Sequence, residues 1–207
     1  MNIIEELHNN NIIKFNFENF YTFASGIRSP IYLDLRKACS YPHIRKYFIQ
    51  EISQKFFNLK ELDTTSPPTI VGTPYAAISW GAMVALTNYL PYLYLRKEAK
   101  NYGQKKLIEG ETSFLHESKE IIIFEDVVTT GKSSLETIDK IQKELNLENN
   151  NFRIISLFNY QLNDKIPYPA DFLIGFEEIF QYIKNCSTMS QKYTQRLMEW
   201  NQTNKII

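Results

Sequence analysis

The chain has 207 residues, enough to bury a sizeable core and too few for more than one full domain with a small subdomain. Its 43% hydrophobic and 22% charged residues lie near the average of globular proteins, which excludes a disordered or fibrous chain. The 23 basic residues balance 23 acidic ones, so no long-range field favours a nucleic-acid or membrane partner. No export signal opens the sequence and no apolar run reaches the roughly 18 residues of a membrane span, so we expect a cytoplasmic protein.

The first part of the chain predicts a small hood. A short N-terminal helix, an extended segment over residues 20–36 and an amphipathic helix near residues 42–57 follow one another. We expect residues 1–60 to lean over a core built by residues 61–207, within a single domain that spans residues 1–207.

The core is predicted to be α/β, with a central, mostly parallel sheet flanked by helices. Short apolar runs alternate with amphipathic stretches, as in strands that helical crossovers join. Helices are predicted over 76–86 and 133–145, the latter with a capping box between Ser133 and Glu136, and the tail 178–207 is predicted to be helical. The predicted strands are the runs at 69–71, 92–95, 121–124, 153–158 and 171–176.

The segment IIIFEDVVTTGKSS, residues 121–134, predicts a phosphate site. A buried strand ends in Glu125 and Asp126 and passes through a hydroxyl-rich turn into a helix, whose free N–H groups and dipole favour an anion. The turn from Thr129 to Ser133 can wrap a monophosphate. The two carboxylates can accept hydrogen bonds from ribose hydroxyls and stabilise positive charge on the sugar ring.

Other phosphate-binding motifs do not match residues 121–134. A P-loop needs a glycine where Asp126 stands, and the chain contains no GxGxxG fingerprint of a dinucleotide-binding fold. A purely structural acidic pair would leave two charges beside a buried strand without a reason.

A second signal is the basic loop LRKEAKNYGQKKLIEGE, residues 95–111. Its cations can neutralise a departing pyrophosphate while the loop closes over it and excludes water. By itself such a loop is more often a solvated surface, but its place between two strands of a phosphate-binding sheet favours a lid.

Three segments in the same order carry a family resemblance. The segment at 121–134 resembles the phosphoribosyl pyrophosphate (PRPP) signature of type I phosphoribosyltransferases. The loop RKEAKNYG and the segment FYTFASGIRSPIYLDLR, residues 20–36, resemble the lid and the base-facing segment of the orotate phosphoribosyltransferases. This resemblance implies the type I phosphoribosyltransferase fold, transfer of phosphoribosyl to orotate in pyrimidine (UMP) synthesis, Mg²⁺ held mainly through PRPP and water, and a homodimer with shared active sites.

The resemblance also implies roles for individual residues. Lys100, Asp126 and Glu125 are predicted to be catalytic, with Lys100 stabilising the leaving pyrophosphate. Tyr32, Leu33, Thr129 and Tyr160 are predicted to line the base pocket. The predicted PRPP-binding residues are Tyr75, Ala76, Arg96, Lys97, Lys100, Tyr102, Glu125, Asp126, Val127, Val128, Thr129, Thr130, Gly131, Lys132 and Ser133.

One departure from the family pattern concerns the base. The family usually carries an Asp-Arg pair whose arginine binds the orotate carboxylate, and here Asn159 and Tyr160 stand at that place. The candidates for holding the carboxylate in its place are Arg28, Arg153, backbone N–H groups near Gly26 and the hydroxyl of Tyr160. The alternatives are a phosphoribosyltransferase for another base and a PRPP-binding regulator without catalysis.

Overall fold

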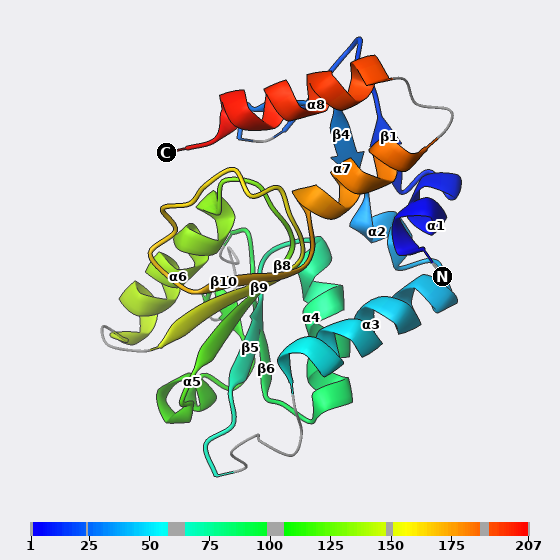
Figure 1. Cartoon of the computed structure of the whole chain (residues 1–207). Helices are drawn as coiled ribbons and strands as arrows, with labels where there is room; N and C mark the ends of the chain where they lie inside the picture. Colours follow the sequence, from blue (N-terminus) through cyan, green and yellow to red (C-terminus); the bar gives the residue numbers. More distant parts are fainter. Residues whose placement is uncertain are drawn as a thin grey trace.

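The structure is a computed structural model that describes residues 2–23, 25–57, 65–98, 106–147, 151–186 and 191–206. A central sheet runs through the lower part of the molecule, and a smaller layer of helices and short strands covers one end of it (Figure 1). Among the described helices, none combines the length and the apolar character that crossing a membrane requires.

The described sheet has the strand order β10-β9-β8-β5-β6-β7. All neighbouring strands pair in parallel except β6 and β7, which are antiparallel. This confirms the predicted, mostly parallel sheet. Its strands are β5 (Thr69–Gly72), β6 (Tyr92–Leu95), β7 (Ile108–Glu109), β8 (Ile121–Val128), β9 (Phe152–Asn159) and β10 (Ala170–Gly175).

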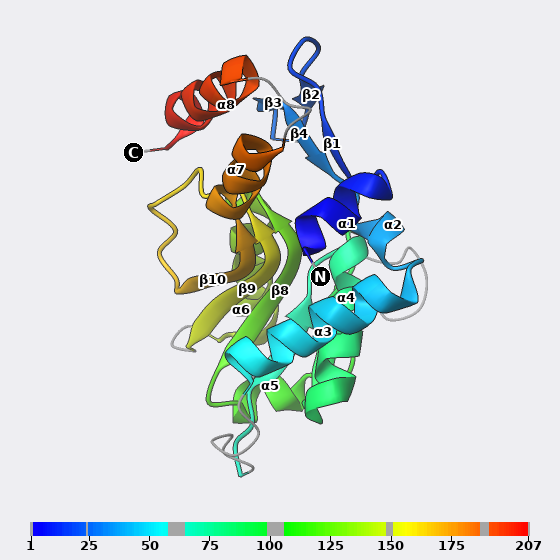
Figure 2. The same ribbon diagram turned by 45° about the vertical axis from the view of Figure 1, so that its right-hand side comes forward.

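Helices cover both faces of the sheet, as the uniformly apolar strands require. On one face α4 (Ala76–Asn88) packs against β5 and β8, and α3 (Pro42–Phe56) packs on α4; on the other face lie α5 (Ser113–Glu117) and α6 (Lys132–Leu145) (Figures 1 and 2). Alternate side chains of β8 are buried on opposite faces of the sheet. Ile122 and Phe124 pack in the core on the α4 side, whereas Ile121 and Ile123 pack in the core on the α6 side.

The hood is built from both ends of the chain. Its N-terminal part holds α1 (Ile3–Asn9), the antiparallel pair β1 (Ile13–Phe15) and β4 (Ile31–Leu33), the pair β2 (Tyr21–Thr22) and β3 (Arg28–Ser29), and α2 (Leu35–Ala38). The tail adds α7 (Phe176–Asn185) and α8 (Gln191–Asn204), which lie beside these elements in both views (Figures 1 and 2). The tail therefore forms two described helices. The predicted helix near 42–57 corresponds to α3, which packs on α4 beside the sheet and not within the hood. The boundary at residue 60 stays a prediction.

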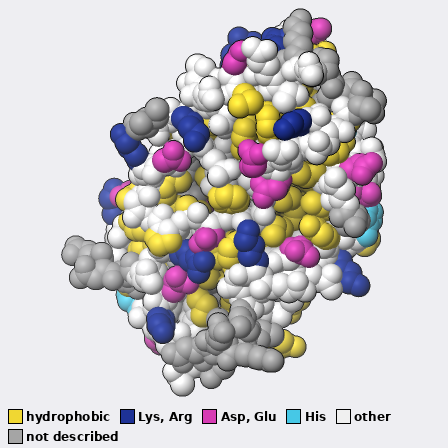
Figure 3. All heavy atoms as spheres, viewed as in Figure 1, with side chains coloured by type: hydrophobic (Ala, Val, Ile, Leu, Met, Phe, Trp, Pro, Cys, Tyr) yellow, Lys and Arg dark blue, Asp and Glu magenta, His cyan; other side chains and the backbone are white. Residues whose placement is uncertain are grey.

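Charged side chains of both signs are interspersed on the face seen in Figure 3. That distribution matches the balanced composition and leaves any functional charge to local clusters.

Candidate active site

The carboxyl end of β8 and the first turn of α6 enclose a cavity of about 290 Å³. All the residues of the predicted phosphate turn, from Thr129 to Ser133, line it together with Glu125, Val127 and Val128. The sequence analysis missed three further lining residues: Ser25 of the hood segment, and Ser134 and Glu136 of α6. Ser25 stands in the SG turn of the base-facing segment, and that turn was the signal that could have pointed to it. The hood therefore reaches the phosphate turn.

The phosphate turn presents free backbone donors to the cavity. Gly131, the N-cap of α6, has φ of 77°, a left-handed conformation that glycine adopts without strain. The predicted Ser133–Glu136 capping box is wrong, because the helix begins at Lys132 and Ser133 is already inside its first turn. The Lys132 N–H donates to Thr130 Oγ1 at 3.4 Å. Uncapped N–H groups at a helix N-terminus are the donors that an anionic phosphate can use.

Residues of the β9–β10 connection contact the phosphate turn. The Asn163 amide donates to the Thr130 carbonyl oxygen at 2.7 Å, and the side chain of Ile166 lies against Gly131. A methyl group added at Gly131 would come within 2.7 Å of Ile166 Cδ1. The turn thus has little room to change its path.

Glu125 lies on the α6 side of β8 and is only 5% exposed. Its carboxylate accepts hydrogen bonds from Thr73 Oγ1 at 2.6 Å and from Ser134 Oγ at 3.1 Å. It therefore ties the turn after β5 to the first turn of α6. Burial raises the pKa of Glu125 to about 7, with the neighbouring Asp126 adding to the rise while the Thr73 hydroxyl opposes it.

We expect Glu125→Gln to remove a pH dependence of stability. The carboxyl has an ordinary pKa of 4.5, so between pH 4.5 and about 7 the folded protein keeps a proton that the unfolded chain releases. The retained proton adds to the free energy of unfolding at low pH. This contribution, about 3 kcal/mol in total, is lost as the pH rises through 7. The neutral amide does not titrate, so the variant should gain stability relative to the parent between pH 5 and pH 8, as measured by urea unfolding.

The matched control for that measurement is Glu144→Gln, which makes the same change at an exposed position of α6. Parallel loss of stability in the parent and in Glu125→Gln from pH 5 to pH 8 would contradict the expectation.

Asp126 lies on the opposite side of β8 from Glu125, because neighbouring residues of a strand point to opposite faces. Burial raises its pKa, the backbone N–H groups of Val127 and of Asp126 itself lower it, and the Arg36 guanidinium of the hood lowers it further. Asp34, also of the hood, raises it. The two predicted ribose carboxylates therefore have different surroundings: Glu125 joins the cavity wall, and Asp126 faces the hood.

The turn between β5 and α4 carries the predicted pyrophosphate residues Tyr75 and Ala76. Tyr75 has φ of 79°, an uncommon conformation for a residue with a side chain, and the residue is 64% exposed. The Lys97 ammonium lies 5.9 Å from the centre of that ring, and the Tyr75 hydroxyl is the main cause that raises the pKa of Lys97. The structure thus brings Tyr75, Ala76 and Lys97 together.

The rest of the basic loop is only partly described. Arg96 Nε lies 2.5 Å from Glu109 Oε1, so this guanidinium is paired with β7. The predicted residues Lys100 and Tyr102 lie outside the described residues. Their roles stay predictions.

The predicted base-binding residues fall in different places. Thr129 lines the phosphate cavity, whereas Tyr32 and Leu33 are half-buried in β4 of the hood. Tyr160 is 1% exposed, its hydroxyl donates to the Ile31 carbonyl oxygen at 3.1 Å, and its ring packs edge-on against Trp200 at 5.9 Å. Burial raises the pKa of Tyr160. The structure therefore gives Tyr160 a place in the core that joins the sheet to the hood.

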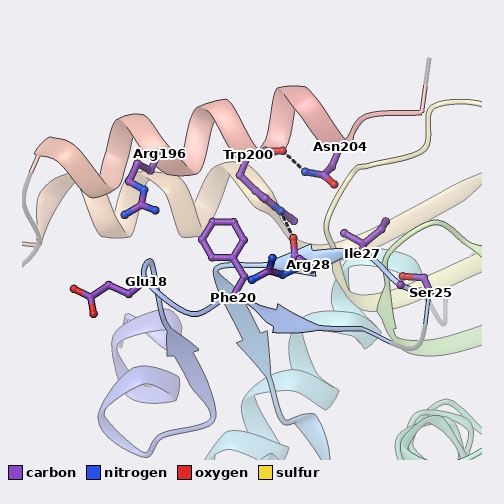
Figure 4. Close-up of a pocket in the computed structure, with 9 residues that line it drawn as sticks. Glu18, Phe20, Ser25, Ile27, Arg28, Arg196, Trp200 and Asn204 are labelled. Atoms are coloured by element: carbon purple, nitrogen blue, oxygen red, sulfur yellow. Dashed lines mark hydrogen bonds between the residues drawn. The ribbon is translucent and has the colours of Figure 1, made fainter.

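A second hollow, of about 730 Å³, lies between β3 and α8 (Figure 4). Arg28 enters it from the hood and Arg196 from α8, and Trp200 Nε1 donates to the Arg28 carbonyl oxygen at 2.5 Å. Ser25 lines this hollow as well as the phosphate cavity. The C-terminal helix thus helps to fix the base-facing segment.

Comparison with known proteins identifies relatives over most of the chain, although no protein-family model matches it. The chain is 34% identical over 193 residues to an orotate phosphoribosyltransferase of Fusobacterium nucleatum, covering 88% of this chain and 85% of that one. It is 29% identical over 209 residues to an orotate phosphoribosyltransferase of Oceanobacillus iheyensis, covering 97% and 98% of the two chains.

Solved structures share the fold. UMP synthase of Leishmania donovani superimposes with a TM-score of 0.72 at 23% identity, over 97% of this chain and 42% of that longer one. Orotate phosphoribosyltransferase of Aeropyrum pernix superimposes with a TM-score of 0.66 at 18% identity, over 88% and 98% of the chains. With the sheet, the hood and the phosphate turn in place, and with identity above 30% across most of a curated relative, the chain belongs to the orotate phosphoribosyltransferase family.

Proposed function

We propose that the protein transfers the phosphoribosyl group of PRPP to the N1 nitrogen of orotate, forming orotidine 5′-monophosphate and pyrophosphate on the route to UMP. The observation that carries this proposal is the cavity at the carboxyl end of β8, lined by Glu125 and by residues 127–134. Backbone donors of the turn and the first turn of α6 suit the 5′-phosphate, because they combine free N–H groups with the positive end of a helix dipole.

The reaction displaces pyrophosphate at ribose C1, so positive charge develops on the ribose ring. Asp126 lies in β8, the strand that leads into the phosphate turn, and its carboxylate can stabilise that charge and accept hydrogen bonds from ribose hydroxyls. Tyr75, Ala76 and Lys97 stand together beside the uncapped N-terminus of α4, which suits the departing pyrophosphate. The orotate nitrogen attacks as an anion, so the reaction needs positioning and charge stabilisation more than a general base.

Magnesium is part of the proposal. Asp126 offers a carboxylate of the type that magnesium accepts, and the described residues hold no group of three or more acidic, histidine or cysteine side chains that could bind an ion together. The ion would take its other oxygens from PRPP and water, and it would neutralise negative charge on the leaving group.

A homodimer in a cytoplasmic setting is proposed as well, with the lid of one subunit completing the site of the other. The support is the family resemblance of the basic loop, together with the exposed apolar side chains Leu86 and Tyr89 at the end of α4, which are 76% and 89% exposed.

The test is an assay of the purified protein with PRPP, magnesium and one base at a time. Formation of orotidine 5′-monophosphate with orotate, and no nucleotide with uracil, adenine, hypoxanthine or guanine, is the expected result. Turnover with another base alone would select a phosphoribosyltransferase of different specificity. Binding of PRPP without turnover of any base would select a regulatory binding protein.

A further inference from the structure

The structure raises the question of which cation holds the orotate carboxylate. The hydroxyl of Tyr160, which stands where the family pattern has an arginine, is committed to the Ile31 carbonyl oxygen inside the core. A carboxylate in a closed pocket without a partner would bind poorly, and the planar guanidinium of arginine is the side chain best suited to it. The answer offered here rests on the proposed function.

The chain contains six arginines, and all of them lie in the described residues. Arg153 Nε lies 2.7 Å from Asp171 Oδ2, and it stands near the amino end of β9, away from the end where β8 meets the phosphate turn. Arg96 is paired with Glu109, and Arg45 donates to the Cys39 carbonyl oxygen. Arg153 thus lies at the wrong end of the sheet, and the side chains of Arg96 and Arg45 are engaged by other groups of the chain.

Arg28 and Arg196 line the second hollow, which lies against α8 (Figure 4). In that view the Arg28 side chain points toward Phe20, away from Ser25, the residue that this hollow shares with the phosphate cavity. Both arginines therefore lie on the α8 side of the hood. Arg36 stands elsewhere, in α2, which Trp80 of α4 bonds through the Leu35 carbonyl oxygen.

Arg36 stands in α2 between a predicted base-lining residue and a predicted ribose-binding residue. Its Nη2 donates to the Tyr32 hydroxyl at 3.3 Å, and its charge acts on Asp126. The Arg36 side chain is 66% exposed, and its Nε lies 3.5 Å from Asp34 Oδ1, so the guanidinium keeps N–H groups that face outward.

The backbone that carries Arg36 is held firmly. Asp34 caps α2 by accepting from the Lys37 N–H at 3.2 Å, and the buried Trp80 donates from Nε1 to the Leu35 carbonyl oxygen at 3.1 Å. Because Trp80 belongs to α4, this bond fixes α2 to the helix that follows the pyrophosphate turn.

The chemistry of orotate places its carboxylate beside the ribose. The carboxylate is on C6, which is bonded to N1, the atom that forms the bond to ribose C1. A cation that pairs with this carboxylate must therefore lie close to C1, near the carboxylate that holds the ribose. Arg36 meets this condition because α2 is bonded to α4, and α4 packs on the face of β8 from which Asp126 projects. Arg36 contacts the base side through the Tyr32 hydroxyl.

We propose that Arg36 binds the carboxylate of orotate and so takes the role that the arginine missing at Tyr160 has in the family pattern. Two N–H groups of the guanidinium can meet both carboxylate oxygens, and this selects orotate over bases that lack the acid.

The test compares two nucleotides that differ only in this carboxylate. Calorimetry of Arg36→Gln should show orotidine 5′-monophosphate bound about 10- to 150-fold more weakly than by the parent, the range for losing a hydrogen bond to a charged group. Affinity for UMP should change less than about twofold, because UMP has no carboxylate. Arg36→Lys, which keeps the charge and loses the planar fork, should fall between the two.

Arg196→Gln, which removes a cation of α8, is the matched control and should leave both affinities unchanged. Equal affinities of parent and Arg36→Gln for orotidine 5′-monophosphate, or an equal loss for both nucleotides, would overturn the inference. Loss of discrimination in Arg28→Gln in place of Arg36→Gln would overturn it too. Absence of orotate turnover in the parent enzyme would instead overturn the proposed function, and the separate turnover assay distinguishes these failures.

Discussion

Replacement of Asp126 by asparagine is expected to lower the turnover of orotate by about two to three orders of magnitude, the size found when one group that stabilises a transition-state charge is removed. The amide has the same shape and can still hydrogen-bond, but it carries no charge to offset the positive ribose. Steady-state rates with PRPP and orotate in excess measure the effect. We expect weaker PRPP binding as well, since an amide is a poorer acceptor for ribose hydroxyls.

The matched control is Asp139→Asn, which removes an exposed carboxylate of α6 that pairs with Lys143 at 2.7 Å. It should leave turnover within about twofold of the parent, since an exposed helix pair contributes little. A turnover rate of Asp126→Asn close to that of this control would remove Asp126 from the site.

Replacement of Gly131 by alanine is expected to weaken PRPP binding by about 100-fold, the effect of losing one or two hydrogen bonds to a charged group. An alanine at φ of 77° is strained, and its methyl group would meet the Ile166 side chain. The turn must move, and its N–H groups then no longer converge on the phosphate. Calorimetric titration with PRPP and magnesium measures the loss.

Gly110→Ala provides the comparison. Gly110 has φ of 119°, and an added methyl group would meet Leu93 Cγ at 2.9 Å, so the strain is similar, but the residue does not line the phosphate cavity. Both variants should lose about 1–2 kcal/mol of stability. A similar loss of PRPP affinity in both would mean that general destabilisation, and not the shape of the turn, causes the effect.

The sheet could be predicted from the sequence because its strands are short, uniformly apolar runs between amphipathic helices. The runs at 69–71 and 92–95 match β5 and β6, whereas β8 extends beyond the predicted 121–124 through Glu125 and Asp126 to Val128. The sequence analysis missed β7 and α5, which have two and five residues and are too short to show a period. Local patterns thus predicted the elements that bury a regular face and missed those that depend on their neighbours.

Contacts between distant parts of the chain account for the other differences. The tail was predicted to be helical, but its fold-back over the hood depends on Trp200, which contacts the Arg28 carbonyl oxygen and the ring of Tyr160. In the same way, the family pattern predicted a base contact for Tyr160, whereas the structure buries that ring between the sheet and the hood. Burial of this kind is a tertiary property, and no local pattern reveals it.

The candidate site shows the same division. The turn from Thr129 to Ser133 was predicted as a unit, since all its residues are neighbours in the sequence, and the structure places them around one cavity. Arg36 was overlooked, although it follows Tyr32 in the segment IYLDLR. Its importance becomes visible only when α2 is seen beside Asp126, a residue far away in the sequence.

A crystal structure of the protein with orotidine 5′-monophosphate would show where the phosphate and the ribose bind. We expect the 5′-phosphate within hydrogen-bond distance of the backbone N–H groups of Thr130 to Ser133, and the ribose hydroxyls beside Asp126. A nucleotide whose phosphate lies outside the cavity at the end of β8, or whose ribose is turned away from Asp126, would contradict it.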